Sequence, residues 1–231
     1  MIDLRGVRGW VFDIDDTLYL ESDYVMSGFM AVGRWIKAAH GIHNFAEAAI
    51  ARFERGARGT TFNLALADIG VEAHAWLVAQ MVREYRTHAP EIALPDDARS
   101  FITRLVGTMP IAIISDGPLD SQSRKVTALG LNAITNVVLL TDRWGPQFSK
   151  PHERAFCEVE SALNLRNEQL IYFADNPAKD FHCPHARGWQ TVRIRRPGGQ
   201  HHHVVMPKNE VGMEVTSFAA IEAILPRGAV R

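Results

Sequence analysis

The spacing of short apolar runs is the feature that most constrains the fold of this chain of 231 residues. Each run is short, and most are rich in β-branched or aromatic residues, which is typical of buried strands. The runs are Val7–Phe12, Ile111–Ile114, Val137–Leu140, Leu170–Phe173 and Thr191–Ile194. Helix-like segments separate the later runs, at Ser121–Ala128, Glu153–Leu163 and Asp180–Arg187. This alternation predicts a doubly wound, Rossmann-like α/β core, with a parallel sheet and helices on both faces.

The interval between the first two runs is too long for a single crossover. About a hundred residues separate Phe12 from Ile111, whereas a strand–helix–strand unit takes about 30 residues. Helix start and stop signals divide the surplus into four helices. They are Asp23–Ala39, Phe45–Ala57, Thr61–Ile69 and Val71–His88. We therefore expect a core domain at 1–18 and 97–231, and an inserted helical cap domain at 19–96.

Acidic residues follow the first apolar run directly. Asp13, Asp15 and Asp16 are followed by Thr17. Carboxylates this close repel one another and lose solvation unless a cation holds them. In an open parallel sheet, ligands bind at the carboxyl ends of the strands. Taken alone, the segment could also be an acidic turn whose aspartates cap a helix.

Other predicted strands also end in polar groups. Ser115 and Asp116 follow the second run, Lys150 precedes the helix-like segment 153–163, and Asp175, Asn176 and Asp180 follow the fourth run. Because the carboxyl ends of parallel strands meet at one edge, we expect these groups to lie together. They would supply a nucleophilic carboxylate, a hydroxyl donor, a cation and oxygen ligands for a hard metal ion. That set suits phosphoryl transfer.

These residues resemble the motifs of a known superfamily. Asp13-x-Asp15-x-Thr17, Ser115, Lys150 and Asp175-x4-Asp180 are similar, in order and spacing, to the four motifs of the haloacid dehalogenase (HAD) superfamily. The helical insertion resembles the cap of one large subgroup. The stretches YLESDYVMSGFMAVGRW, FADNPAKDF and RIRRPGG also resemble a bacterial branch of HAD hydrolases linked to surface-polysaccharide gene clusters.

The resemblance implies a Mg²⁺-dependent phosphatase with two catalytic carboxylates. Asp13 would be the nucleophile that forms an aspartyl-phosphate. Asp15 would protonate the leaving oxygen and then deprotonate the attacking water. Mg²⁺ would be held by Asp13, by Asp15 through its backbone carbonyl, and by Asp175.

The remaining motif residues are implied to bind the phosphate or to support the metal site. Ser115 and the amide of Asp116 would bind phosphate oxygens. Lys150 would neutralise charge between the nucleophile and the phosphate. Asp180 would be a ligand through water or an anchor behind the metal, and Asn176 would support the same site.

Other reaction types remain as alternatives. HAD dehalogenases lack the second aspartate of the first motif because a halide leaves without a proton, so Asp15 argues against that chemistry. A phosphonatase needs a Schiff-base lysine, and the insertion offers only Lys37. A response-regulator receiver fits the insertion and Asp15 poorly. From a different class, a phosphate- or metal-binding regulatory protein with little turnover remains open.

Histidines near the C-terminus allow a zinc hypothesis. His182, Cys183 and His185 could combine with His201–His203, although the segments lack paired ligand spacing. Solvated loop and helix positions are the ordinary alternative.

The predicted cap offers polar candidates for substrate contact. Arg58 and Asn63 are the favoured positions, and the neighbouring candidates are Arg52, Arg55 and Thr61. Each could equally belong to a solvated helix face. A cap of this size suits a small substrate, such as a sugar, polyol or nucleotide phosphate.

Charge and cysteine content narrow the partners and the compartment. The chain has 25 Lys and Arg against 26 Asp and Glu, a net charge of −1 that offers no attraction for nucleic acid or an acidic membrane. Two cysteines, Cys157 and Cys183, fit a reducing compartment. No apolar run has the length of about 18 residues that a membrane span needs, and residues 1–9 lack a secretory signal pattern. We expect a cytoplasmic monomer or homodimer that acts on a small phosphorylated substrate.

Overall fold

The computed structural model describes residues 2, 4–206 and 211–223. It divides the chain into two compact units, each with its own core. The α/β unit comprises Met1–Glu21 and Ala93–Arg231, and the helical unit comprises Ser22–Ile92. The insertion that we predicted at 19–96 brackets the helical unit.

Six parallel strands form the sheet of the α/β unit, in the order β3-β2-β1-β4-β5-β6. Their bounds are β1 Gly9–Phe12, β2 Ile111–Ser115, β3 Val137–Leu140, β4 Leu170–Ala174, β5 Gln190–Ile194 and β6 Met213–Val215. The first five strands coincide with the predicted apolar runs, and the α/β class with a parallel sheet is confirmed. The sequence pattern missed β6 because its three residues, Met-Glu-Val, form no apolar run.

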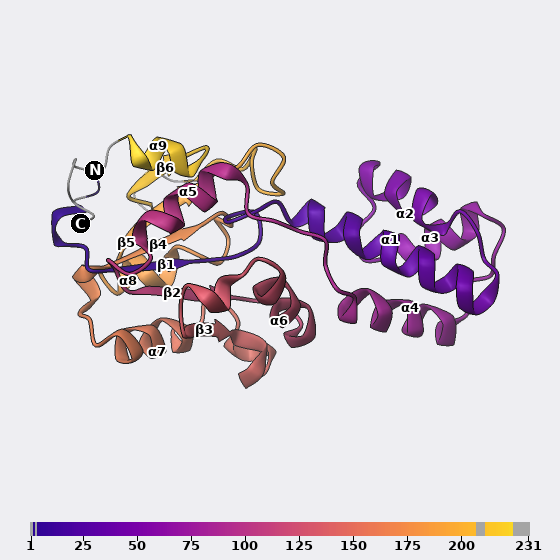
Figure 1. Ribbon diagram of the computed structural model, residues 1–231, viewed down its shortest axis with the longest axis horizontal. Coiled ribbons are helices and arrows are strands. Elements are labelled where there is room, and N and C mark those ends of the chain that lie inside the picture. The colour runs from indigo at the N-terminus through magenta and orange to yellow at the C-terminus, as the bar shows by residue number, and fades with distance from the viewer. Residues whose placement is uncertain (1, 3, 207–210, 224–231) are drawn as a thin grey trace. The chain divides into compact units, whose positions relative to one another are not determined.

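Helices cover both faces of this sheet (Figure 1). On one face, Phe101 of α5 (Asp96–Leu105) packs against Trp10 of β1, with ring centroids 5.6 Å apart. Phe218 of α9 (Phe218–Glu222) stacks on the same phenylalanine. On the other face, Phe156 of α7 (Arg154–Leu163) packs edge-on against Tyr172 of β4. Because successive strand residues point to opposite faces, β1 and β4 supply both layers of the core.

Two further α-helices belong to the described part of this unit. They are α6 (Leu119–Ala128) and α8 (His182–Ala186). Both belong to segments that we predicted as helical, whereas α5 was not predicted. Its buried residues, Ala98, Phe101, Ile102 and Leu105, recur at helical spacing, so the pattern was present in the sequence and was overlooked.

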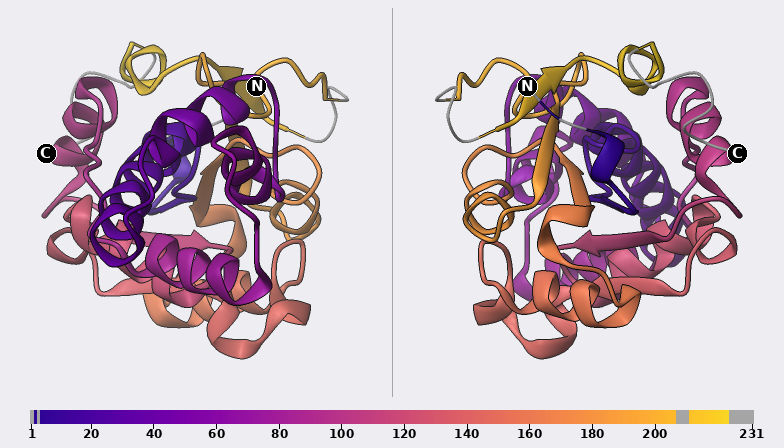
Figure 2. Two further views of the ribbon diagram at one scale, coloured as in Figure 1. Left: turned by 90° about the vertical axis from the view of Figure 1, so that its right-hand side faces the viewer. Right: turned by 90° about the vertical axis from the view of Figure 1, so that its left-hand side faces the viewer.

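The helical unit is built from four helices, α1 to α4 (Figure 2). They span α1 Glu21–His40, α2 Phe45–Glu54, α3 Thr61–Asp68 and α4 Ala75–Thr87. Their apolar faces form a separate core that includes Phe29, Val32, Phe45, Leu66 and Met81. Four helices were predicted here, although α4 begins four residues later than expected, at Ala75 instead of Val71. No helix in the described part of the chain is long and apolar enough to cross a bilayer.

The position of β1 determines where the candidate site lies. It pairs with β2 on one side and with β4 on the other. Beyond the end of β1, the N–H of Asp13 donates to the carbonyl of Phe173 at 2.9 Å, so Asp13 continues the strand. The chain proceeds outward from β1 to β3 and returns to β4 on the opposite side, which makes β1/β4 a topological switch point.

Candidate active site

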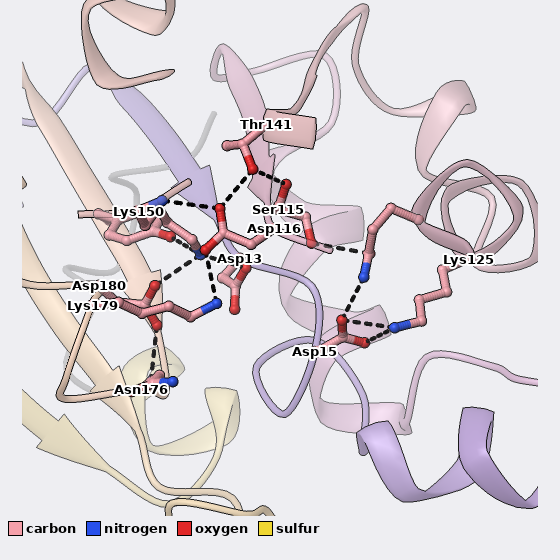
Figure 3. A network of polar contacts seen from close by, with 12 residues as sticks. Asp13, Asp15, Ser115, Asp116, Lys125, Thr141, Lys150, Asn176, Lys179 and Asp180 are labelled. Atoms are coloured by element: carbon pink, nitrogen blue, oxygen red, sulfur yellow. Dashed lines mark hydrogen bonds and ion pairs between the residues drawn. The ribbon is translucent and has the colours of Figure 1, made fainter. Parts of the chain in front are cut away.

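Lys150 connects the first and fourth motifs at the end of β1 (Figure 3). Its Nζ donates to Oδ1 of Asp13 at 2.8 Å and to the hydroxyl of Tyr172 at 3.0 Å. The same Nζ lies 2.8 Å from Oδ1 of Asp180. Burial opposes the charge of this lysine, but Asp13 and Asp180 hold the pKa of Lys150 well above its usual value. Lys150 is therefore an ammonium ion fixed beside the candidate nucleophile.

Asp175 lies close to the two carboxylates that contact this ammonium. Asp13, Asp175 and Asp180 each offer an oxygen, and these oxygens lie within 4.8 Å of one another. Burial, followed by the charges of Asp13 and Asp180, raises the pKa of Asp175 to about 9. Burial also raises the pKa of Asp13 to about 6, against the lowering effect of Lys150. Full ionisation of the cluster therefore needs more positive charge than its described surroundings supply.

The donor set of this cluster fits Mg²⁺. Oδ1 of Asp180 is buried and accepts no hydrogen bond from the described residues, although it lies 2.8 Å from the ammonium of Lys150. No described residue donates a hydrogen bond to the carboxylate of Asp175 either. Hard oxygen ligands with spare lone pairs are what Mg²⁺ takes in proteins. Asp13, Asp175 and Asp180 are thus the residues that could hold the ion.

Asp15 has a different environment from Asp13. Lys125 Nζ donates to both of its carboxylate oxygens, at 2.7 and 2.8 Å. Tyr19 donates to Asp15 at 2.6 Å and the amide of Gln122 at 2.9 Å. Burial acts to raise the pKa of Asp15, but Lys125 and these hydrogen bonds lower it overall. The two aspartates of the first motif therefore differ in their surroundings. Asp13 belongs to the acidic cluster, and Asp15 is bound by Lys125.

Gln122 links Asp15 to the second motif. The hydroxyl of Ser115 donates to Oε1 of Gln122 at 3.0 Å, while Nε2 of the same amide donates to Asp15. The amide cannot be turned around, because its NH₂ group must face the carboxylate. Glu21 is a further acidic group near Asp15, and burial together with the charge of Asp15 raises the pKa of Glu21 to about 7.

Asp116 organises the loops on the other side of the nucleophile. Its Oδ1 accepts from the hydroxyl of Thr141 at 2.8 Å and from the backbone N–H of Lys150 at 3.1 Å. Its Oδ2 accepts from Nζ of Lys179 at 2.8 Å. Burial acts to raise the pKa of Asp116, but Lys150 and Lys179 hold it below its usual value. Asp116 is therefore a fixed anion at the end of β2.

Two buried arginines, Arg193 in β5 and Arg196 just after it, anchor the motif backbones. Arg193 donates to the carbonyl of Asp175 at 3.0 Å. Arg196 donates to the carbonyl of Thr17 at 3.2 and 3.1 Å, and also binds Asp97. The carboxylate of Asp16 accepts from the N–H groups of Glu21 and Gln200. Asp16 thus takes the helix-capping role that we considered for the whole acidic turn, whereas Asp13 and Asp15 do not.

The loop that follows β4 is closed by hydrogen bonds within itself. The backbone N–H of Asn176 donates to Oδ2 of Asp180 at 2.9 Å, and the side chain of Asn176 accepts from the N–H of Ala178. This closed turn orients Asp180 toward Lys150.

With this geometry in place, comparison with known proteins identifies the family. The model of the haloacid dehalogenase-like hydrolase family matches residues 10–194. The chain belongs to this family of HAD-like hydrolases. A curated relative is the glyceraldehyde 3-phosphate phosphatase of Methanopyrus kandleri, 26% identical over 201 residues, which are 82% of this chain and 84% of that protein.

Solved structures of HAD proteins share the fold of this hydrolase. The HAD-hydrolase YfnB of Bacillus subtilis, solved with magnesium, matches with a TM-score of 0.65 and 19% identity over 95% of this chain and 98% of that chain. A 2-haloacid dehalogenase of Pseudomonas syringae pv. Tomato matches with a TM-score of 0.61 and 16% identity over 94% of this chain and 97% of that chain.

In this HAD-like hydrolase, Asp13, Asp15, Ser115, Asp116, Lys150, Asn176 and Asp180 lie together at the carboxyl end of the sheet (Figure 3), and Asp175 joins Asp13 and Asp180 there. The two candidates in the helical unit have local roles. Nη1 of Arg58 donates to the carbonyls of Phe53 and Ala57, and its guanidinium lies 3.7 Å from the centroid of the Phe53 ring. Asn63 is exposed on α3.

The zinc hypothesis receives no geometric support. Asp13, Asp175 and Asp180 are the group within the described residues whose ligand atoms converge on one ion position. The histidines and Cys183 that we considered form no such group among the described residues, and Nδ1 of His202 lies 3.0 Å from the carbonyl oxygen of Arg195.

Sequence analysis missed the residues that contact the predicted ones. Lys125, Gln122 and Tyr19 surround Asp15, and Lys179 pairs with Asp116. A signal for two of them exists, because Gln122 and Lys125 fall at helical spacing with Val126 on the buried face of α6. Polar residues on a buried helix face indicate a polar partner inside the protein.

Proposed function

We propose that this HAD-like hydrolase is a Mg²⁺-dependent phosphatase that hydrolyses a small phosphomonoester through an aspartyl-phosphate on Asp13. The observation that carries the proposal is the pair of carboxylates at the end of β1. Asp13 is bonded to a buried ammonium beside an acidic cluster, and Asp15 is clamped apart from it by Lys125. A nucleophile and a separate proton-transfer group are what the two displacements require.

In the first displacement, the carboxylate of Asp13 attacks phosphorus and the ester oxygen leaves. Lys150 holds Asp13 in place and lies where it can offset the charge of the phosphoryl oxygens. Ser115 contributes its hydroxyl, which must turn from Oε1 of Gln122 toward the phosphate, and the backbone N–H of Asp116 contributes a further donor. The phosphate-binding role of these groups rests on their shared position at the strand ends.

Asp15 transfers the proton in both displacements. The negative charge of a bound phosphate favours the protonated form of a nearby carboxyl, so Asp15 can donate to the leaving oxygen. Once that proton is gone, the clamp of Lys125, Tyr19 and Gln122 favours the carboxylate, which then accepts a proton from water. The water attacks the aspartyl-phosphate and releases inorganic phosphate.

Mg²⁺ held by Asp13, Asp175 and Asp180, and by the backbone carbonyl of Asp15, would neutralise the charge on the phosphoryl group. The convergence of three buried carboxyl groups, one of which has its pKa raised to about 9, supports this part of the proposal. Asp180 also pairs with Lys150. It would bind the ion either directly or through a water molecule.

A sugar, polyol or nucleotide phosphate is the substrate class that we propose. Because the Methanopyrus relative is named a glyceraldehyde 3-phosphate phosphatase, we would test glyceraldehyde 3-phosphate first. We propose that the helical unit supplies selectivity for the leaving group, with Arg58 and Asn63 as candidates.

A panel of phosphate esters assayed with Mg²⁺ tests the function. The wild-type protein should release phosphate, and Asp13→Asn should release none while keeping its thermal transition. Asp120→Asn is the matched control, because Asp120 is an exposed carboxylate on α6. A regulatory protein would bind Mg²⁺ or phosphate with no turnover on any ester. Release of halide from 2-haloacids, with no release of phosphate, would instead indicate a dehalogenase.

A further inference from the structure

Lys179 is a charged residue beside the nucleophile that the proposed mechanism does not use. It lies in the loop between β4 and α8, and its Nζ donates to Oδ2 of Asp116 at 2.8 Å. Its side chain is 32% exposed, whereas that of Lys150 is fully buried. Of these two lysines near Asp13, Lys179 is the one whose side chain is partly exposed.

The carboxylate of Asp116 lies at the end of β2, where its negative charge opposes phosphate binding. Thr141 and the backbone of Lys150 already fix the orientation of its carboxylate. The charge of that carboxylate would repel a phosphate dianion bound at the end of β2. The ammonium of Lys179 offsets this charge at the point where the phosphate is expected to bind.

The ammonium of Lys179 also has donors to spare. A lysine ammonium has three N–H bonds, and among the described residues Asp116 is the hydrogen-bond partner of the ammonium of Lys179. Figure 3 shows the side chains of Lys150 and Lys179 both pointing toward Asp13, each from a different loop. The charge of Asp13 acts on Lys179 as well, and together with Asp180 and Asp116 it keeps the pKa of Lys179 above its usual value despite burial and the repulsion of Lys150.

We propose that Lys179 is a second phosphate-binding cation, which Asp116 holds in place and which donates to the non-bridging oxygens of the phosphoryl group. The inference rests on the proposed phosphatase function. Lys150 bonds the attacking carboxylate itself, so its loss acts on the chemical step. Lys179 bonds no atom of Asp13, so its loss acts mainly on phosphate affinity.

This difference predicts a split between KM and kcat. Lys179→Met should raise KM for p-nitrophenyl phosphate, and the inhibition constant of inorganic phosphate, by about tenfold or more, as expected for a lost hydrogen bond to a charged group. The value of kcat should fall by a smaller factor. Lys179→Arg should recover most of the affinity, because it keeps the charge. Lys37→Met is the matched control, since Lys37 is an exposed lysine on α1.

A double variant that removes both charges of the Lys179–Asp116 pair tests whether Lys179 binds phosphate or only neutralises Asp116. If Lys179 served only to neutralise Asp116, Asp116→Asn combined with Lys179→Met would bind phosphate as well as Asp116→Asn alone. That equality would overturn the proposal. We expect the double variant to bind phosphate more weakly than Asp116→Asn. Because it buries no unpaired charge, the double variant also provides the comparison if Lys179→Met fails to fold.

Calorimetric titration with inorganic phosphate in the presence of Mg²⁺ keeps this test apart from the proposed activity. A wild type that hydrolyses no ester, yet binds phosphate in a manner weakened by Lys179→Met, would refute the activity and support the site. A wild type that hydrolyses esters, with Lys179→Met unchanged in KM and in phosphate affinity, would refute the site alone. A wild type that binds no phosphate would refute the site as well.

Discussion

The ammonium of Lys125 donates two hydrogen bonds, 2.7 and 2.8 Å long, to the carboxylate of Asp15. Lys125 lies on α6, and its side chain is only 3% exposed. A lysine is rarely buried to this extent unless it is paired. The pair therefore connects α6, the helix after β2, to the turn after β1. It also favours the ionised form of Asp15 before substrate binds.

The Lys125–Asp15 pair should make a large contribution to stability. Lys125→Met leaves the carboxylate of Asp15 buried without its cation, and we expect a loss of about 3 kcal/mol in the free energy of unfolding. Adding Asp15→Asn removes the unpaired charge and should recover much of that loss. Chemical denaturation of the two single variants and the double variant measures the coupling. Additive losses would show that the two side chains do not interact.

Asp15→Asn should affect esters according to their leaving group. An alkyl phosphate such as glycerol 3-phosphate needs a proton on the departing oxygen, so its phosphorylation of Asp13 should slow by about a hundredfold or more. p-Nitrophenolate leaves without a proton, so that ester should lose far less. Single-turnover rapid-quench measurements isolate this step. Equal losses on both esters would remove Asp15 from the acid role, and Asp120→Asn is the control.

Mg²⁺ should stabilise the protein through the acidic cluster. A ligand at a hundred times its dissociation constant adds about 2.7 kcal/mol, which corresponds to a rise of about 5–10 °C in Tm for a protein of this size. Asp175→Asn should abolish most of the rise, whereas Asp120→Asn should keep it. Thermal scans with MgCl₂ and with EDTA measure the effect. An undiminished rise in Asp175→Asn would place the ion elsewhere.

The link between Asp97 and Arg196 should produce a defined pH dependence. Burial acts to raise the pKa of Asp97, but the bonds from Arg196 and from the N–H of Phe218 lower it overall. A carboxyl whose folded pKa is depressed contributes stability above its unfolded pKa, about 3.9, and loses it as the pH falls through the folded value.

Asp97→Asn should therefore cost about 1 kcal/mol at pH 7, and the difference from wild type should shrink below about pH 4. Denaturation at a series of pH values measures it. Asp96→Asn is the control, because Asp96 is the adjacent residue and its side chain is fully exposed. A deficit that stays constant down to pH 3 would mean that the charge of Asp97 is not its source.

The helical unit should influence selectivity more than chemistry. Arg58→Ala or Asn63→Ala should lower kcat/KM for the preferred ester by about tenfold, and should leave p-nitrophenyl phosphate nearly unchanged. Arg34→Ala is the control, since Arg34 is an exposed arginine of the same unit. Kinetics on the ester panel test this. An unchanged ranking of substrates would mean that both residues only face solvent.

Local patterns in the sequence were sufficient to predict five of the strands and the residues at their ends. Apolar runs of four to six residues indicate buried strands. Helices cover both faces of a parallel sheet, so the side chains on both sides of each strand are buried. The parallel arrangement then follows from the intervening helices, and it brings the strand ends to one edge. The strand β6 was missed because it carries no continuous apolar run, whereas the helix α5 was missed although its apolar residues recur at helical spacing.

What the sequence by itself determined was the α/β class, the long insertion of helices and the identity of the groups at the strand ends. Tertiary structure alone decided which of these groups meet. Lys125 clamps Asp15 from 110 residues away, Lys179 reaches Asp116 across 63 residues, and Arg196 holds the carbonyl of Thr17. A charged residue in a sequence has the same appearance whether its partner is water or a buried carboxylate. The choice between them depends on burial, which arises only when distant segments pack together and remove the water.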